Sequence, residues 1–301
     1  MMEALGFEFF RNALLAGLLA SVICGVIGSL VVVNRIVFLA GGVAHASYGG
    51  VGLAFYLGLP VLPVTAGFST LAALCMAWVT LTSRERADTV IGVLWAAGMA
   101  LGIILLDLTP GYNADLMSYL FGSILAVPVE DLWLMAALAA VVLALVALFA
   151  RGLLVMSFDT DFARSRGVPV RFLHFLLMGL TALCVVMVIR VVGLILVLAL
   201  LTIPPFMAER RCRSLAGMML LSAVLSALFC VGGLWLSYSL DLTSGASIIA
   251  VACVGVGLLR CQPPRRRPEK TAGRAWGDGT PAATVRSPGR PAPPRTTGCT
   301  R

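Results

Sequence analysis

His45 lies in the middle of a long apolar segment, although the 301-residue chain contains only two histidines. The surrounding residues, FLAGGVAHASYGG (38–50), belong to a stretch over 36–59 that is long enough to cross a bilayer. At 1.5 Å per residue His45 is about 15 Å from the start of that helix, near the bilayer midplane, where ionisable groups face a cavity or a partner. A neutral imidazole binds Zn, Mn or Fe because it offers a lone pair without a charge. His45 is therefore a candidate metal ligand.

Small residues dominate the helix face that carries His45. The positions three, four and seven residues away are Gly41, Gly42, Tyr48, Gly49 and Gly52. Two interpretations remain open. Either the glycines let another helix pack closely while His45 forms a hydrogen bond across the contact, or the missing side chains open a cavity around the imidazole. The second interpretation makes Gly41, Gly42, Tyr48 and Gly49 the lining of a translocation cavity.

Two adjacent prolines interrupt the apolar segment LALLTIPPFMAERR (198–211). Pro204 and Pro205 remove two amide donors and free the carbonyls of Leu200 and Leu201, so a helix kink is predicted. Inside a membrane these carbonyls need protein, water or a cavity as a partner. The sequence leaves open whether they line part of a pathway.

A polar segment, SFDTDFARSRGVPVRF (157–172), separates two of the apolar stretches. Asp159 and Asp161 stand before FARSRG and Gly167 ends it, which is the arrangement that caps a short helix and complements its dipole. We expect this segment on the cytoplasmic side. It is either a solvated connecting loop or a docking helix for a cytoplasmic partner.

The composition indicates a polytopic membrane protein. Hydrophobic residues make up 60% of the chain and charged residues 12%, and the mean hydropathy is +1.00, whereas soluble domains carry about 25% charged residues. The predicted fold is all-α with eight or nine transmembrane helices, because the boundary near Arg190 is poorly defined. The candidate spans are 9–33, 36–59, 61–82, 88–107, 131–150, 172–190, 191–208, 214–239 and 244–259. Between the fourth and fifth spans we expect a short re-entrant or interfacial helix on the outer side.

Arginines between the spans predict the orientation of the chain. With nine spans they gather on one side, apart from Arg11 and Arg190, which places the N-terminus outside and the C-terminus in the cytoplasm. The net charge of +8 comes from residues 260–301, because residues 1–259 contain twelve Arg and twelve acidic residues. The basicity therefore predicts no nucleic-acid partner. We expect a transmembrane domain over 1–259 and a disordered, basic, Pro- and Arg-rich tail over 260–301.

Four segments, in this order, resemble the permease subunit of the ABC transporters that import zinc, manganese or iron. They are NRIVFLAGGVAHASYGGVGLAFYLGLP, ADLMSYLFGSILAVPVEDL, SFDTDFARSRGVPV and VVGLILVLALLTIPPFMAERR, within residues 9–259. The resemblance implies a homodimeric, multi-pass permease in a bacterial or archaeal plasma membrane. It also implies separate cytoplasmic ATP-binding subunits, an extracytoplasmic metal-binding protein, and a divalent metal ion as cargo rather than a permanently bound cofactor. The sequence contains no G-x-x-x-x-G-K-[ST] loop, which agrees with a transporter subunit that is not itself an enzyme.

The same resemblance matches His45 to the histidine of the translocation site. It matches DFARSRGV to the segment that couples the permease to its ATPase, so the expected coupling residues are Asp159, Asp161, Ala163 and Gly167. A two-fold dimer would present His45 twice about its axis. The chain departs from the zinc and manganese members at Gly41, where they have an aspartate one helical turn before the histidine. The replacement ligands that we consider are Tyr48, backbone carbonyls, Asp107 and Asp115, and a substrate other than a free metal ion also remains open.

Two other classes of function remain as alternatives. A stand-alone secondary carrier of metal or a small solute, driven by an ion gradient, needs intramembrane carboxylates. The expected spans contain almost none, since Asp107 and Glu209 lie at span ends. A structural membrane subunit without cargo would have no use for His45 in a glycine-lined cavity.

Overall fold

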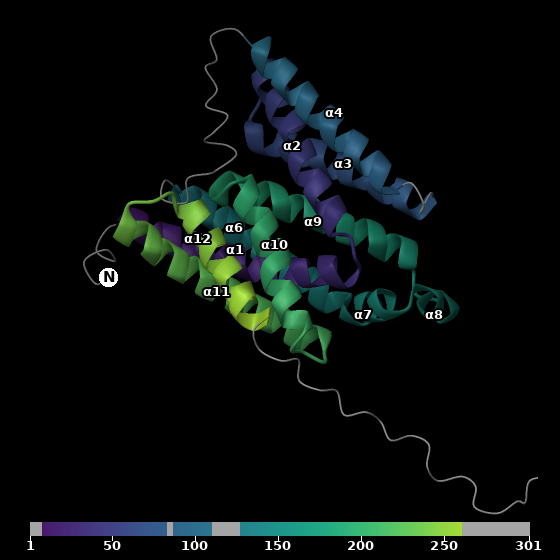
Figure 1. The fold of residues 1–301 in the computed structure, drawn as a ribbon. Coiled ribbons are helices and arrows are strands. Elements are labelled where there is room, and N and C mark those ends of the chain that lie inside the picture. Colours follow the sequence, from purple (N-terminus) through teal and green to yellow (C-terminus); the bar gives the residue numbers. More distant parts are fainter. Residues whose placement is uncertain (1–7, 83–86, 110–126, 261–301) are drawn as a thin grey trace, which may run out of the picture. The chain divides into compact units, whose positions relative to one another are not determined.

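The computed structural model describes residues 8–82, 87–109 and 127–260, and these residues form helices joined by short connections (Figure 1). The helices are α1 (Glu8–Val33), α2 (Val37–Leu57), α3 (Val61–Thr82), α4 (Ala87–Asp107), α6 (Val129–Leu148), α7 (Ala150–Phe158), α8 (Thr160–Ser165), α9 (Val170–Val192), α10 (Leu194–Glu209), α11 (Leu215–Leu240) and α12 (Ser244–Arg260).

The helices confirm the all-α, polytopic membrane fold that the sequence predicts. Within the described residues seven helices are long and apolar enough to cross a membrane, and α10 and α12 contribute two shorter apolar helices. Each of the nine candidate spans coincides with one of these nine helices. A helix satisfies its backbone hydrogen bonds internally, which is why long apolar segments in lipid adopt this structure.

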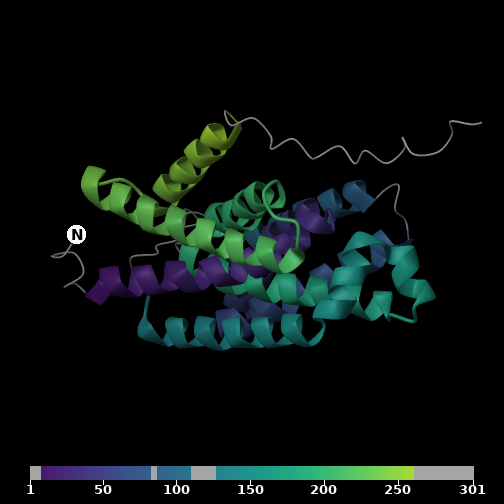
Figure 2. The same ribbon diagram turned by 90° about the horizontal axis from the view of Figure 1, so that it is seen from below.

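Helix α1 lies at the centre of the packing. It contacts α11, α10, α6 and α9, and Figure 2 shows it (purple) between α11 (green) and α6 (teal). Small residues allow this contact, because a Cβ on Gly25 would lie 2.6 Å from the Cα of Ala223 in α11. The buried hydroxyl of Ser29 donates to the Gly25 carbonyl at 2.7 Å, so α1 brings no unpaired polar group at this position.

Helices α2, α3 and α4 pack together as a group of three (Figure 1). Contacts between α2 and α4 run in the same order along both helices, from Gly42 beside Ile91 to Gly52 beside Gly102, so these two helices are parallel. Contacts between α2 and α3 run in opposite order, with Gly50 beside Thr65 and Gly42 beside Met76, so α3 is antiparallel to α2. This group positions His45.

A single glycine separates α9 from α10. Gly193 has φ +90°, a backbone conformation that L-residues other than glycine rarely adopt. Helix α10 begins at the next residue. The sequence placed this boundary near Arg190, but Arg190 still belongs to the last turn of α9. Its Nε lies 3.1 Å from Oδ2 of the buried Asp131 in the first turn of α6. Arg190, one of the two arginines that fall outside the predicted cytoplasmic group, therefore has an acidic partner.

Some expectations fall partly or wholly outside the described residues. They are most of the outer helix predicted between the fourth and fifth spans, the ligand candidate Asp115, and the disordered tail over 260–301. The division into a transmembrane domain over 1–259 and that tail therefore stays a prediction, as do the membrane orientation and the dimer.

Candidate functional site

His45 lies in the middle of α2, where it stacks on an aromatic side chain of α4. The imidazole of His45 and the indole of Trp95 have centroids 4.1 Å apart and ring planes inclined by 14°. The indole Nε1–H donates to Sδ of Met99, one turn further along α4, at 3.1 Å. The sequence alone does not identify Trp95, because the helical positions of α2 cannot show which residue of another helix lies across from His45.

Nδ1 of His45 is buried and has no hydrogen-bond partner among the described residues. Most buried polar atoms in proteins have such a partner, so an orphan nitrogen needs an explanation, and a bound ion is one of those known. The buried hydroxyls of Thr65, Ser69 and Ser226 also lack a partner among the described residues. No carboxylate of the described residues lies within ion-pair distance of His45. In that same part of the chain no three His, Cys, Asp or Glu side chains are close enough to hold a metal. One copy of the site therefore supplies an imidazole and not a complete ligand set.

Two of the glycines near His45 serve close helix packing. A Cβ on Gly49 would lie 2.9 Å from the carbonyl oxygen of Gly98 in α4. A Cβ on Gly42 would lie 2.7 Å from Cγ2 of Ile91, which also belongs to α4. Both glycines thus make the close helix contact of the first interpretation, without the hydrogen bond that it expected from Nδ1 of His45. Their role as cavity lining stays a prediction.

Gly41 differs from its neighbours, because a Cβ there would meet only Cδ2 of Leu198, at the ordinary contact distance of 3.9 Å. Space for a side chain therefore exists one helical turn before His45. Tyr48 is buried, and its carbonyl lies against Gly102 of α4. The role of Gly41 and Tyr48 in lining a cavity also stays a prediction.

Asp107, one of the acids considered as a replacement ligand, is distant from the imidazole within one copy. It ends α4 and is exposed, and it lies twelve residues after Trp95. That separation corresponds to about 18 Å along the helix axis. Asp107 therefore cannot share a metal with His45 of the same copy in this conformation.

Pro204 and Pro205 both lie inside α10, which continues as a helix through them. The carbonyl of Leu201, freed by Pro205, lies against α1, where a Cβ on Gly28 would be only 2.6 Å from the oxygen. Gly28 thus allows α1 to cover this carbonyl, and Cα–H groups make weak donors in such contacts. Protein therefore covers one of the two freed carbonyls, while the kink stays a prediction.

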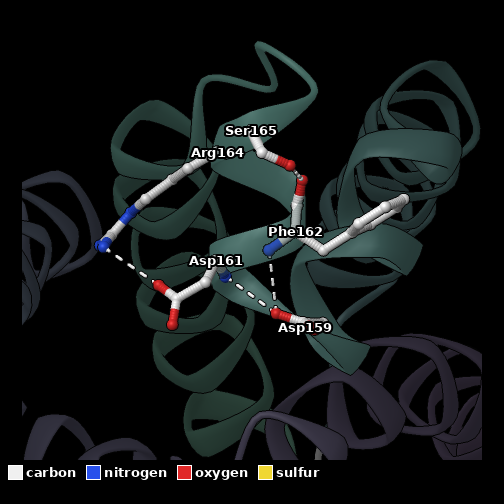
Figure 3. A network of polar contacts seen from close by, with 5 residues as sticks. All are labelled: Asp159, Asp161, Phe162, Arg164 and Ser165. Carbon is white, nitrogen blue, oxygen red and sulfur yellow. Dashed lines mark hydrogen bonds and ion pairs between the residues drawn. The ribbon is translucent and has the colours of Figure 1, made fainter.

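The polar segment forms the short helix α8, which is capped at both ends. Figure 3 shows the N-terminal cap at Asp159. The Asp159 carboxylate accepts hydrogen bonds from the backbone N–H groups of Asp161 and Phe162, at 3.0 and 2.9 Å. At the other end Gly167 has φ +75°, and its N–H donates to the Arg164 carbonyl at 3.0 Å. These local capping residues are the ones that the sequence indicates.

One side of α8 is buried and another presents aromatic surface. Ala163 is fully buried, whereas Phe162 is 48% exposed and Phe158, at the end of α7, is 71% exposed. The guanidinium of Arg166 lies 5.2 Å from the centroid of the Phe162 ring. Exposed aromatic and arginine side chains of this kind are typical of protein interfaces.

Comparisons with known proteins identify the family. The model of the ABC 3 transport family matches residues 6–259. The chain is 50% identical over 254 residues to the uncharacterized membrane protein slr2045 of Synechocystis, covering 84% of this chain and 90% of that protein. It is 34% identical over 250 residues to the manganese transport system membrane protein MntC of Halalkalibacterium halodurans, covering 83% and 86%. The structure of PsaBC from Streptococcus pneumoniae in complex with Fab superposes with a TM-score of 0.77 at 33% identity, covering 85% of this chain and 93% of that one. The chain is a multi-pass plasma-membrane permease that belongs to the ABC 3 transport family.

Proposed function

We propose that this chain is the membrane-spanning subunit of an ABC-type importer for a divalent metal ion, energised by ATP hydrolysis in a separate cytoplasmic subunit. Membership in an ABC transport family supports the energy source. The manganese named for the relative MntC supports a metal as cargo. Zinc and iron remain candidates because imidazole binds all three metals.

The observation that carries the proposal is the unpartnered Nδ1 of His45, buried in the middle of a membrane-spanning helix. Placing an imidazole at this depth costs free energy. Binding of a metal ion to the imidazole would offset that cost. In a homodimer two copies of His45 would face each other across the axis and share the ion. Tyr48, backbone carbonyls and water would complete the coordination, because α2 supplies no carboxylate.

The proposed mechanism is alternating access. An extracytoplasmic metal-binding protein delivers the ion to the outer opening, and His45 holds it near the midplane. The ATPase docks on α8 and the end of α7, where Phe162 and Phe158 expose apolar surface beside the N-terminal cap of α8. Closure of the ATPases on ATP moves α8, and the helices then expose the His45 region to the other side.

Transport in proteoliposomes tests this function. Vesicles that contain the full chain and its ATPase should take up radioactive Mn²⁺, Zn²⁺ or Fe²⁺ only when ATP is supplied on the cytoplasmic side. Uptake by the chain alone under a proton gradient would instead support the secondary carrier. That alternative gains no support from the described spans, in which the buried acid Asp131 is already paired with Arg190.

A further inference from the structure

We propose that Trp95, held in place by Met99, is a positioning residue that fixes the plane of the His45 imidazole for the cargo metal. The proposal rests on the proposed function, because it assumes that His45 meets a metal ion. It concerns a residue of α4 that would make no bond to the ion.

The indole of Trp95 lies flat against the imidazole of His45. With centroids 4.1 Å apart and planes inclined by 14°, the indole covers one face of the imidazole. A metal ion binds an imidazole nitrogen in the plane of the ring, along the lone pair. Face-to-face stacking therefore leaves the metal-binding direction open while it opposes rotation of the ring out of that plane.

The stack with Trp95 takes the place of the hydrogen bond that usually orients a metal-binding histidine. A metal-binding histidine usually donates its other ring N–H to a carboxylate, a carbonyl or water, and that hydrogen bond orients the ring. Whichever ring nitrogen of His45 binds the metal, the other makes no such hydrogen bond to a described residue. We infer that the stack with Trp95 orients the ring in its place.

Two further contacts hold the indole of Trp95 in its orientation. Its Nε1–H, the only hydrogen-bond donor of the indole, points at Sδ of Met99 at 3.1 Å. The ring of Phe38, two turns before His45 on α2, also contacts the indole at a centroid distance of 6.2 Å. Rotation of the indole away from His45 would break both contacts.

The backbones of α2 and α4 are in close contact next to the stacked pair. A Cβ on Gly98 would lie 2.8 Å from the Cα of Ala46, and one on Gly102 would lie 2.5 Å from the Tyr48 carbonyl oxygen. The backbones of α2 and α4 therefore touch one turn beyond Trp95, which fixes the register of the two helices. His45 and Trp95 are held as a preorganised pair.

Equilibrium binding of Zn²⁺ to the purified full-length chain tests the proposal. Trp95→Leu removes the aromatic face and should weaken binding about tenfold, the effect expected when the partner that orients a metal ligand is lost. Trp95→Phe keeps an aromatic face and should weaken binding less than Trp95→Leu. Trp78→Leu is the matched control, since Trp78 lies on α3 with 63% of its surface exposed, and it should bind as the unchanged chain does.

A spectroscopic readout separates positioning from a general loss of structure. In a chain where the other four tryptophans are replaced by Phe, Zn²⁺ should change the emission of Trp95, and His45→Ala should abolish that change. Met99→Leu should lower the Zn²⁺ affinity without unfolding the protein, which covers the case that Trp95→Leu fails to insert. Unchanged Zn²⁺ affinity in both the Trp95→Leu and Met99→Leu chains, with binding still lost in His45→Ala, would overturn the role of Trp95 and leave the proposed function standing. A chain that neither binds nor transports metal would overturn both.

Discussion

The α2–α4 pair and the α7–α8 segment use side chains in opposite ways. Between α2 and α4 glycines bring the two backbones together around a half-buried imidazole. In α7 and α8 two phenylalanines are exposed, and α8 keeps its shape through the caps at Asp159 and Gly167. The first region therefore depends on tight packing that no added side chain can enter. The second exposes apolar surface, which the proposed ATPase subunit would cover.

The largest effect should come from filling the α2–α4 contact. Gly102→Leu places a side chain against the Tyr48 carbonyl, where the backbone cannot yield, and should cost about 3 kcal/mol of stability or more. Gly92→Leu is the control in the same helix, since no atom lies within 4 Å of its added Cβ. Thermal unfolding in detergent should show a large loss for the first variant only, and equal stability of the two would contradict the packing described here.

Next in size is a change to the exposed surface of α8. Phe162→Asp should leave the permease folded, because the ring is 48% exposed, but it should weaken ATPase docking by about 2 kcal/mol, or about thirtyfold. Measured affinity for the ATPase and ATP-driven uptake should fall together. A variant that docks normally would show that α8 is a solvated connection and not a docking helix.

A third prediction compares Gly41, where an added side chain has space, with Gly42, where it would meet Ile91. Gly41→Asp adds a carboxylate one turn before His45, where only Leu198 is near, and should lower the KM for Mn²⁺ on the order of tenfold because Mn²⁺ favours oxygen ligands. Gly42→Asp should instead destabilise the protein, since its Cβ meets Ile91. No change in KM for a folded Gly41→Asp chain would place the cargo path away from this face of α2.

The smallest effect should come from removing the cap of α8. Asp159→Ala leaves two backbone N–H groups without their carboxylate partner, which should cost about 1 kcal/mol and raise hydrogen exchange in residues 160–165 about fivefold. Arg164→Ala removes only an exposed ion pair to Asp161 and should change exchange less than about twofold. Equal effects would mean that α8 is held by its tertiary contacts and not by its cap.

Local features could be predicted from the sequence. Hydropathy and length located the nine long apolar helices of the described residues, because a span needs one long apolar stretch whatever its neighbours are. The caps of α8 were predictable for the same reason, since Asp159 and Gly167 act on backbone groups a few residues away.

Features that join two helices could not be predicted. The sequence could not show that Trp95 lies on His45, or that Gly28 faces the carbonyl of Leu201, because both contacts depend on how helices pack. For the same reason it could not separate Gly41, which has space, from Gly42, which has none. The boundary expected near Arg190 lies at Gly193, whose φ of +90° separates α9 from α10. Arg190 stays in α9 and pairs with Asp131, 59 positions earlier in the chain, a contact that the sequence could not show.

The measurement that tests the account most directly is metal uptake by the His45→Ala permease. Proteoliposomes with the ATPase and ATP should lose at least about tenfold in uptake rate, because the proposed metal ligand is gone. His174→Ala serves as the control, since this second histidine lies on α9, where its Nε2 is 3.3 Å from the Thr80 hydroxyl. Uptake that falls with His45→Ala and persists with His174→Ala is the predicted result. Unchanged uptake by a folded His45→Ala chain would contradict the central claim that this imidazole meets the cargo.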